Sequence, residues 1–302
     1  MLVNIPRGKY ILAVSGGVDS AVLLDILAKM SDIDLIVAHF NHGIRSDSKE
    51  DEDLVRKNAH KYNLPFEIGH GKLGASASEE RARDARYKFL EYTRHKHKAQ
   101  AIITAHHQDD LIETAILNII RGTGRRGLSA IEGNPRILRP MLSLRKEQVL
   151  SYARKNYLSW REDPSNKDQR YLRNYIRLQI TPRLNQRERQ ELLRSLTKVA
   201  KTNRFIDHEI AKISHQISSS KVINRISFTS LPTEISKEVL MYFLRQHSIR
   251  QFDKRTIERL NVALKTAKPQ TQHEVTNDVV FKLSRTEAVL VPAPALNISA
   301  KI

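Results

Sequence analysis

Six consecutive residues near the start of the chain have the composition of an anion-binding turn, Ser15-Gly16-Gly17-Val18-Asp19-Ser20. An apolar run ends just before them at Val14, and a helix-like run begins just after them at Ala21. A glycine turn between a buried strand and a helix N-terminus directs backbone N–H groups and the positive end of the helix dipole at one point. The glycines permit close approach of the backbone, and the serines add hydroxyl donors. The pattern predicts that this turn binds a phosphate group.

The turn differs from the GxxxxGK[ST] phosphate loop because it contains no lysine. A second glycine pattern, Gly122-Thr123-Gly124-Arg125-Arg126-Gly127, matches the GxGxxG fingerprint of dinucleotide-binding proteins. It follows a predicted helix and not a strand, so we exclude nicotinamide binding. We interpret it as a basic loop, in which Arg121, Arg125 and Arg126 are candidates for contact with RNA.

Three further polar clusters lie near the ends of predicted strands, where open parallel sheets bind their ligands. They are His39-Phe40-Asn41-His42-Gly43-Ile44-Arg45, Glu79-Glu80-Arg81-Ala82-Arg83-Asp84-Ala85-Arg86-Tyr87 and His106-His107-Gln108-Asp109-Asp110-Leu111-Ile112-Glu113-Thr114. The last cluster combines histidines and carboxylates, but nothing in it reproduces the HExxH spacing of a zinc site. We therefore expect no transition-metal site here.

Strand and helix patterns alternate through the first half of the chain, which predicts an α/β fold with a parallel sheet and helices on both faces. The expected strands are Tyr10–Val14, Leu35–Phe40, Pro65–Ile68, Ala101–Ala105 and, as an extended segment, Arg136–Met141. The expected helices cover residues 21–27, 48–62, 78–97, 109–120 and 143–157. Asp109 or Asp110 is expected to cap the fourth of these helices and to place a negative charge in its first turn, and Ser143 is expected to open the last one.

The pattern changes beyond Pro182. Residues 184–217 predict one long charged helix, which leaves two alternatives open, a link between domains and a homodimer contact. The tail predicts a small α+β module with strands at 225–228, 275–283 and 288–291, helices at 235–247 and 256–265, and a hairpin near Ser284. We therefore expect a catalytic domain at residues 1–183, a helical connector at 184–220 and a C-terminal domain at 221–302, which we expect to contact RNA.

The composition favours a nucleic-acid partner. The 302 residues include 51 Lys+Arg and 33 Asp+Glu, a formal net charge of +18, which is typical of proteins that contact phosphates. Aromatic residues make up 6%, so we expect no wide base-stacking platform. Cysteine is absent, which excludes disulfides, thiolate zinc sites and persulfide chemistry on this chain. With no apolar run near the ~20 residues of a membrane span and no signal-peptide pattern, we expect a cytoplasmic protein.

The turn at residues 15–20 resembles the SGGxDS loop of the N-type ATP pyrophosphatases (PP-loop enzymes), which cleave ATP to AMP and pyrophosphate. Within that group the chain resembles the tRNA(Ile)-lysidine synthetases, through motifs that recur in the family's order. These motifs are His39-x-Asn41-His42-x-x-Arg45, Glu80-x-Ala82-Arg83-x-x-Arg86-Tyr87, His106-His107-x-Asp109-Asp110-x-x-Glu113-Thr114, Arg121-Gly122-x-Gly124-x-x-Gly127-Leu128, Arg139-Pro140, Glu162-Asp163-Pro164-Ser165-Asn166 and Tyr171-x-Arg173-Asn174-x-Ile176-Arg177. The tail carries no motif of comparable sharpness. The resemblance implies an adenine-nucleotide alpha hydrolase-like fold, which is Rossmann-like.

The resemblance also implies a ligase that modifies tRNA. In that family, the 2-carbonyl oxygen of the wobble cytidine in the CAU anticodon of an isoleucine tRNA attacks the α-phosphate of ATP, which releases pyrophosphate. The ε-amine of free L-lysine then attacks the adenylated ring carbon and expels AMP, which leaves lysidine. The implied ligands are therefore ATP, Mg²⁺, free L-lysine and tRNA(Ile).

The motif residues carry the roles that this reaction requires. Those expected to bind ATP are Ser15, Gly16, Gly17, Val18, Asp19, Ser20, Arg173 and Arg177. The α-phosphate needs a fixed cation, for which Arg86 is the first candidate and Arg173 and Arg177 are the next. Asp19 and Asp110 are expected to hold either the lysine amine or Mg²⁺, and the sequence does not separate these roles. His106 is a candidate base or ATP contact, and the three arginines of the basic loop are expected to hold the anticodon loop.

Several of these assignments have a structural alternative. Asp110 could be a helix cap alone, and Arg86 could be a solvated charge. His39 and His42 could bond loop carbonyls. Glu113 is expected to bond within its helix or to orient a neighbour, and Trp160 to pack in the core. For the whole chain, the alternatives are a tRNA-thiolating enzyme, a synthetase that adenylates a small carboxylate, and a non-catalytic RNA-binding module. The lack of cysteine, the charge of +18 and the intact turn weigh against these in that order.

Overall fold

The chain divides into two compact units, Met1–Ala200 and Lys201–Ile302, in a computed structural model. The structure describes residues 3–43, 47–71, 74, 79–128, 136–163, 166, 168–249 and 252–293. The boundary between the units lies inside one long helix, α8 (Gln186–Ile217). Leu196 of α8 packs with Leu111 of the first unit, and Ile210 belongs to the core of the second. The helix therefore contributes to both cores, and the three-part division expected from the sequence stays a prediction.

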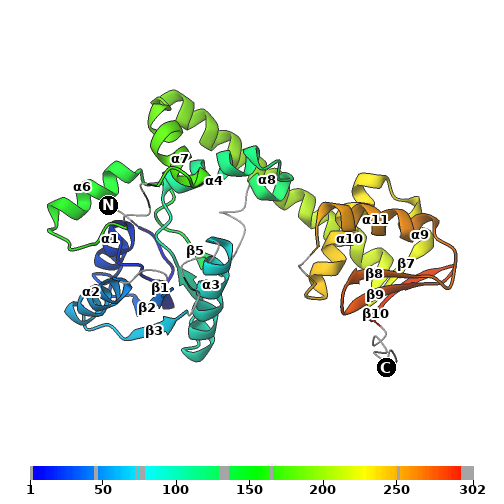
Figure 1. Ribbon diagram of the computed structural model, residues 1–302, viewed down its shortest axis with the longest axis horizontal. Coiled ribbons are helices and arrows are strands. Elements are labelled where there is room, and N and C mark those ends of the chain that lie inside the picture. Colours follow the sequence, from blue (N-terminus) through cyan, green and yellow to red (C-terminus); the bar gives the residue numbers. More distant parts are fainter. Residues whose placement is uncertain are drawn as a thin grey trace, which may run out of the picture. The chain divides into compact units, whose positions relative to one another are not determined.

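The first unit is built on a five-stranded parallel sheet (Figure 1). Its strands are β1 (Gly8–Ala13), β2 (Ile33–Asn41), β3 (Phe66–His70), β4 (Ala101–Ile103) and β5 (Ile137–Leu138). They are arranged in the order β3-β2-β1-β4-β5. The α/β fold with a parallel sheet, expected from alternating strand and helix patterns, is confirmed.

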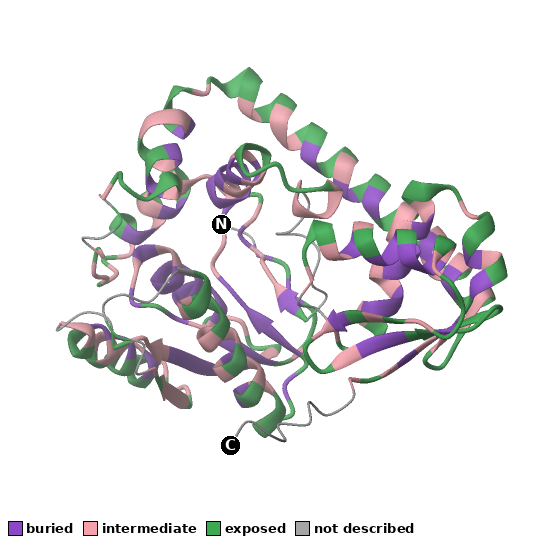
Figure 2. Cartoon of the chain, turned by 45° about the vertical axis from the view of Figure 1, so that its right-hand side comes forward, coloured by how far each residue is buried: buried purple, intermediate pink, exposed green. Residues whose placement is uncertain are grey.

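Helices cover both faces of this sheet because the strand residues alternate between two cores. Leu12 of β1 packs with α1 (Val18–Leu27), α2 (Ser48–Lys61) and α6 (Lys146–Lys155). Its neighbour Ile11 packs on the other face with Leu90 of α3 (Glu79–Lys96). Figure 2 shows the resulting burial along the central strands.

Further helical segments follow β4 and β5 in the chain. α4 (Gln108–Ile120) follows β4, and the short α5 (Arg125–Leu128) follows α4. α7 (Leu172–Tyr175) continues through a π-helical stretch, Ile176–Ile180, into a 3₁₀ turn at Thr181–Arg183. A π-helical stretch often occurs at a functional site, because it changes the direction in which side chains leave the helix.

The starts of two helices differ from expectation. His107, and not Asp109 or Asp110, occupies the N-cap position of α4, and Asp110 accepts a hydrogen bond from the backbone N–H of His107 at 2.9 Å. α6 begins at Lys146 and not at Ser143, because Gln148 accepts the N–H of Arg145 at 2.9 Å in the same arrangement. In both cases a side chain in the first turn reaches back to the N-cap residue, and this fixes the helix start.

The second unit pairs an antiparallel sheet with three helices, in addition to the last part of α8. The strands lie in the order β6-β7-β10-β9-β8 and are β6 (Ser218–Ser219), β7 (Val222–Asn224), β8 (Gln272–Thr276), β9 (Val279–Leu283) and β10 (Glu287–Pro292). The helices are α9 (Arg225–Ser230), α10 (Thr233–Gln246) and α11 (Lys254–Thr266). No helix in the described part of the chain is both long and apolar enough for a bilayer span.

Two strand predictions in this unit are wrong. The expected strand at 225–228 is the helix α9, because the Asn224 side chain accepts the N–H of Ser227 at 3.0 Å and caps it. The expected single strand at 275–283 is the hairpin of β8 and β9, whose strands pair antiparallel. The predicted hairpin near Ser284 is confirmed, since the N–H of Ser284 bonds the carbonyl of Glu287 at 2.8 Å between β9 and β10.

Candidate functional site

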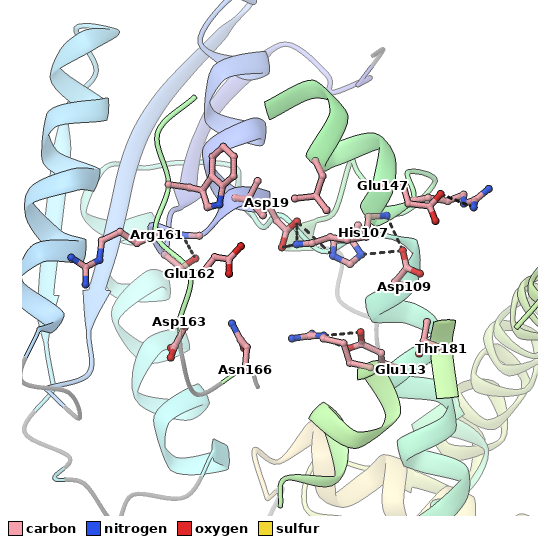
Figure 3. Close-up of a pocket in the computed structure, with 18 of the residues that line it drawn as sticks. Asp19, His107, Asp109, Glu113, Glu147, Arg161, Glu162, Asp163, Asn166 and Thr181 are labelled. Carbon is pink, nitrogen blue, oxygen red and sulfur yellow. Dashed lines mark hydrogen bonds and ion pairs between the residues drawn. The ribbon is translucent and has the colours of Figure 1, made fainter. Parts of the chain in front are cut away.

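The strand order places the candidate site beside the carboxyl ends of β1 and β4. From β1 the chain proceeds to β2 and β3, and then crosses back to β4 on the opposite side of β1. Open α/β sheets bind ligands at such a reversal, where the loops after the two strands separate. The loop after β1 contains Ser15 and the loop after β4 contains His107, and both residues line a pocket of about 730 Å³ (Figure 3).

A serine hydroxyl bonds the backbone of the turn after β1 and fixes its shape. The hydroxyl of Ser20 accepts the N–H of Ser15 at 3.2 Å and donates to the carbonyl of Gly17 at 2.9 Å. Gly16 has a φ of +92°, which favours glycine. No side chain among the described residues caps α1 at Gly17, so the first N–H groups of that helix stay available to an anion.

Asp19 carries the negative charge of this turn, and two cationic groups hold it. The Lys146 Nζ lies 2.6 and 2.8 Å from the two carboxylate oxygens, and the His107 Nε2 lies 3.7 Å from Oδ1. Burial favours the neutral acid, but His107 and Lys146 outweigh it and lower the pKa of Asp19 to about 2. Asp19 is therefore ionised throughout the physiological pH range.

His107 is buried among three carboxylates. Its Nε2 lies 3.4 Å from Asp110 Oδ2 as well as 3.7 Å from Asp19, and its Nδ1 lies 3.8 Å from Asp109 Oδ2. Burial alone would lower the pKa of His107, but Asp19 and Asp110 outweigh it and raise the pKa above its usual value. Proton binding at His107 is thus coupled to the charges of the acidic residues around it.

The pKa values of the two neighbouring histidines, His106 and His42, are shifted in the opposite direction. Burial, with Arg139 and Arg86 nearby, lowers the pKa of His106 to about 4, although Asp110 opposes the shift. Burial and Arg86 lower the pKa of His42, also to about 4. His106 is neutral at physiological pH, and its Nδ1 lies 2.8 Å from the hydroxyl of Thr104.

We expect NMR to distinguish the raised pKa of His107 from the lowered pKa of His106. In a pH titration, the ring signals of His107 should move above pH 6.5, whereas those of His106 should move near pH 4. His107→Gln and His106→Gln would assign the signals. Because the folded-state pKa of His107 is raised, its contribution to stability is present below pH 6.5 and disappears as the pH rises through that pKa. Titration of both rings at the same pH would contradict the charge distribution described here.

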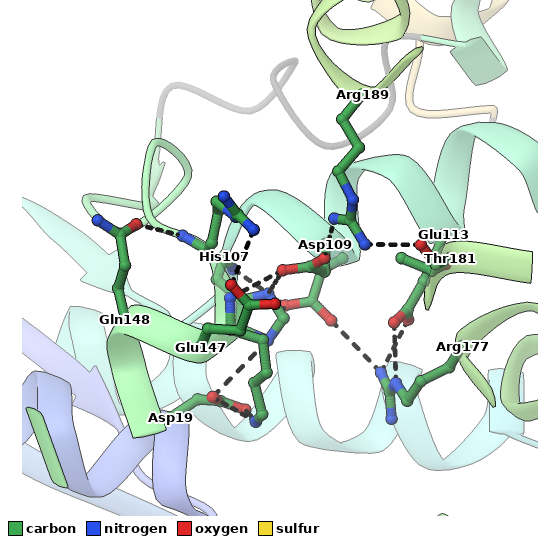
Figure 4. Close-up of polar contacts among 12 residues, drawn as sticks. Asp19, His107, Asp109, Glu113, Glu147, Gln148, Arg177, Thr181 and Arg189 are labelled. Carbon is green, nitrogen blue, oxygen red and sulfur yellow. Dashed lines mark hydrogen bonds and ion pairs between the residues drawn. The ribbon is translucent and has the colours of Figure 1, made fainter. Parts of the chain in front are cut away.

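A second ionic cluster joins α4 to the π-helical stretch (Figure 4). The guanidinium of Arg177 bonds both carboxylate oxygens of Glu113, at 2.9 and 2.8 Å, and lies 3.5 Å from Asp110 Oδ1. Arg173 lies 3.5 Å from Glu113 and 3.8 Å from Asp110. Glu113 is 1% exposed, so this bidentate pair fixes the direction of Arg177 at the pocket wall. The expectation that Glu113 orients a neighbour is met by this contact.

Asp109 braces the same wall and connects three helices of the first unit. Its Oδ2 accepts the backbone N–H of Lys146 at 2.8 Å, and its Oδ1 pairs with Arg189 of α8. Arg189 also donates to the carbonyl of Thr181 at 2.6 Å. Asp109 therefore fixes where α6 begins and holds the first turn of α8 beside it.

Arg161 ties another segment to the turn. Its backbone N–H bonds the carbonyl of Gly16 at 3.0 Å. Its side chain pairs with Glu50, with Asp47 at 2.8 Å and with Asp51 at 2.9 Å around the start of α2. The neighbouring Trp160 packs on the core of the sheet, as expected, and also lines the pocket.

The predicted site residues fall into three groups. Those that line the pocket are Ser15, Gly17, Val18, Asp19, Arg86 and Arg177. Those that hold or contact lining residues are Gly16, Ser20, Asp110 and Arg173. His106 and the basic-loop arginines, Arg121, Arg125 and Arg126, are not among the lining residues. Arg45, Pro164 and Ser165 of the predicted motifs lie outside the described residues.

Sequence reasoning assigned no role to three residues that build the pocket wall, Lys146, Arg161 and Arg189. His107 was seen only as part of a motif. Lys146, Arg161 and Arg189 each contact an acid distant in the sequence, so no local pattern marks these pairs. The only signal of Lys146 and Arg161 in the sequence is closeness to a motif. Lys146 follows the motif Arg139-Pro140, and Arg161 directly precedes the motif that begins Glu162-Asp163.

Comparisons with known proteins agree with this geometry. The family described as the PP-loop domain matches residues 1–184. The tRNA(Ile)-lysidine synthase of Nitrosomonas europaea is 31% identical across 96% of this chain and 67% of its own length. The tRNA(Ile)-lysidine synthase of Thermotoga maritima is 38% identical across 58% of this chain and 45% of its own length. The chain thus aligns with about two thirds of the first relative and less than half of the second.

A solved structure shares the fold. The U34-tRNA thiolase NcsA from Methanococcus maripaludis, with its [4Fe-4S] cluster, superposes with a TM-score of 0.56 at 19% identity. The match covers 65% of this chain and 74% of that one. At this identity the likeness concerns the fold alone.

Proposed function

This chain belongs to the tRNA(Ile)-lysidine synthase family of PP-loop proteins, and from that membership we propose that it joins free L-lysine to the wobble cytidine of an isoleucine tRNA with a CAU anticodon. One observation carries the proposal: a single pocket combines an anion-binding turn with an acidic, arginine-braced wall. The turn suits the phosphates of ATP, and the acidic wall suits an amine. A reaction that consumes ATP and an amine requires both.

In the first step, the 2-carbonyl oxygen of cytosine attacks the α-phosphate of ATP, and pyrophosphate leaves. The turn at Ser15–Ser20 and the N-terminus of α1 provide N–H donors for the departing pyrophosphate. Arg86 lines the pocket from α3, and we assign to it the neutralisation of charge that develops at the α-phosphate. Arg173 and Arg177 pair with Glu113 in the ionic cluster between α4 and the π-helical stretch.

In the second step, the lysine amine attacks the adenylated carbon and AMP leaves. Lysine arrives as an ammonium, so a carboxylate must orient it and accept a proton directly or through water. We assign this role to Asp110, which contacts His107 and Arg177 beside the lining residue Glu113. Asp19 belongs instead to the turn at the N-terminus of α1 and pairs with Lys146 there, so we assign it to the phosphate side of the pocket.

Mg²⁺ accompanies ATP in reactions of this class and binds through few protein oxygens plus phosphate oxygens. The ionised Asp19 fits this use, because a carboxylate offers about four acceptor positions and Lys146 takes two. When bound, the ion would neutralise charge on the phosphates. No group of three or more histidine or acidic side chains suited to a metal occurs among the described residues.

The tRNA itself is expected to bind through charge. The formal net charge is +18, and Arg121, Arg125 and Arg126 are at least partly exposed after α4. We propose that these three arginines hold the anticodon loop while the wobble base enters the pocket. The cytoplasm, which contains tRNA, ATP and lysine together, is the compartment we propose.

The decisive experiment incubates the protein with ATP, Mg²⁺ and labelled lysine, together with an isoleucine tRNA or a methionine tRNA that each carry a CAU anticodon. We expect label on the isoleucine tRNA alone, with the nucleoside mass of lysidine after digestion. A folded protein that binds the tRNA but transfers no label would overturn the proposal.

A further inference from the structure

The phosphate-binding turn of this chain contains no lysine, yet the structure brings one to it from a distant helix. Lys146 is the first residue of α6 and lies 127 positions from Asp19 in the sequence. Its Nζ lies 2.6 and 2.8 Å from the two oxygens of Asp19, the fifth residue of the turn. Both residues line the pocket.

We propose that Lys146 is a phosphate-binding residue, which supplies from α6 the cation that the turn itself lacks and contacts the departing pyrophosphate of ATP. The inference rests on the proposed function, because pyrophosphate is the leaving group of its first step. In the GxxxxGK[ST] loop, a lysine within the loop reaches the terminal phosphates of the nucleotide. Here the equivalent charge comes from elsewhere in the fold.

A backbone hydrogen bond and the packing of α6 fix the position of Lys146. Its backbone N–H donates to Asp109 at 2.8 Å, and Asp109 is held in turn by Arg189. The next turn of α6 packs Val149 into the same core as α1. The side chain must therefore leave the helix towards Asp19, and the approach is built into the packing of α6 on α1.

The ammonium keeps a donor for a ligand. Lysine has three N–H groups, and two of them bond Asp19, which leaves one for an acceptor in the pocket. The side chains of Asp19 and Lys146 are 31% and 37% exposed. Both side chains are thus partly open to the pocket, so a ligand there can reach the ammonium. An anion at the turn would gain both the charge and the hydrogen bond.

A second reading assigns Lys146 to the subsite of the substrate amine, where it would stand in for the lysine ammonium. The geometry favours the phosphate, because Asp19 belongs to the turn at the N-terminus of α1. The acidic residues that suit an amine, Asp110 and Glu113, face Arg177 and not Lys146. The two readings predict different effects of removing Lys146 on the affinity for lysine, no change in the first and tighter binding in the second.

The test compares Lys146→Met, Lys146→Arg and the control Lys155→Met, which removes an exposed lysine from the other end of α6. Calorimetry with magnesium pyrophosphate measures binding, and steady-state assays give the KM for ATP and for lysine. For Lys146→Met we expect roughly 10- to 100-fold weaker pyrophosphate binding and a similar rise in the KM for ATP. The KM for lysine should stay within about twofold. Lys146→Arg should recover most of the loss, and Lys155→Met should match the wild type.

Two results would overturn the inference. Unchanged pyrophosphate binding in a folded Lys146→Met variant would leave Lys146 a structural contact, and a lowered KM for lysine would place it in the amine subsite. Thermal unfolding of each variant separates a folding defect from a binding defect. Because pyrophosphate binding needs no tRNA, the comparison holds even if the wild type forms no lysidine, so the two proposals fail independently.

Discussion

Replacing Asp110 by Asn is expected to stop lysine transfer while pyrophosphate release continues. Asp110 lies 3.4 Å from His107 and 3.5 Å from Arg177, on the acidic wall that we assign to the lysine amine. Loss of a group that orients an ammonium and accepts its proton costs roughly 100- to 10,000-fold in rate. The phosphate turn is built from other residues, so adenylation of the tRNA should persist. The variant would then accumulate adenylated tRNA, which nucleoside mass spectrometry and a pyrophosphate assay detect separately.

The Asn variant is chosen because it preserves the fold. The side-chain oxygen of Asn can still accept the N–H of His107, so the start of α4 keeps its cap. Asp34→Asn is the matched control, since it removes the same charge from a side chain that is 59% exposed in β2 and is not among the lining residues. Equal loss of both half-reactions in Asp110→Asn would instead place this carboxylate in the adenylation step, together with Asp19.

Local sequence signals were enough to predict the parallel sheet and the glycine turn between β1 and α1. The turn at 15–20 joins a strand and a helix that are its immediate neighbours in the sequence, and the bonds of its serine hydroxyls run between residues at most five positions apart. The apolar runs of β1, β2 and β4 are short and continuous, as expected for strands buried on both faces. The carboxyl ends of such strands then indicate where the candidate site lies.

The pairing of charges could not be predicted in the same way. Lys146 and Asp19 are separated by 127 positions, and Arg177 and Glu113 by 64. Many lysines and arginines in a chain of charge +18 could pair with these acids, and the choice depends on how helices pack on the sheet. Sequence patterns therefore indicate the acids, the turn and two of the arginines, whereas the pairing of acids with cations follows only from the fold.

In the second unit, the strand preference of the local sequence leads to the wrong prediction at residues 225–228. The run from Arg225 to Phe228 has β-branched and aromatic residues, but Asn224 starts a helix there. The Arg225 side chain is buried and donates to the carbonyls of Leu264 and Ser284, each at 2.7 Å. These tertiary bonds outweigh the strand preference of four residues, which is weak in any context.

Replacing Arg86 by Met is expected to abolish the first half-reaction. Arg86 lines the pocket from α3, and it is the cation that we assign to the α-phosphate. Loss of a fixed cation at a reacting phosphoryl group costs roughly 1,000-fold or more in rate. Pyrophosphate release should therefore fall by at least that factor, and lysidine formation should fall with it. Arg86→Lys should recover only part of the rate, because an ammonium lacks the planar fork of a guanidinium.

A second, independent readout of Arg86→Met comes from the neighbouring histidines. Arg86 contributes to the low pKa of about 4 at both His42 and His106, so its loss should raise both values. The matched control is Arg81→Met, which removes an exposed charge from the same helix. If Arg86→Met raised these pKa values but left pyrophosphate release intact, Arg86 would influence the pocket only through its field, and the α-phosphate would need another cation. Loss of activity together with the pKa shifts places its charge at the reacting phosphate.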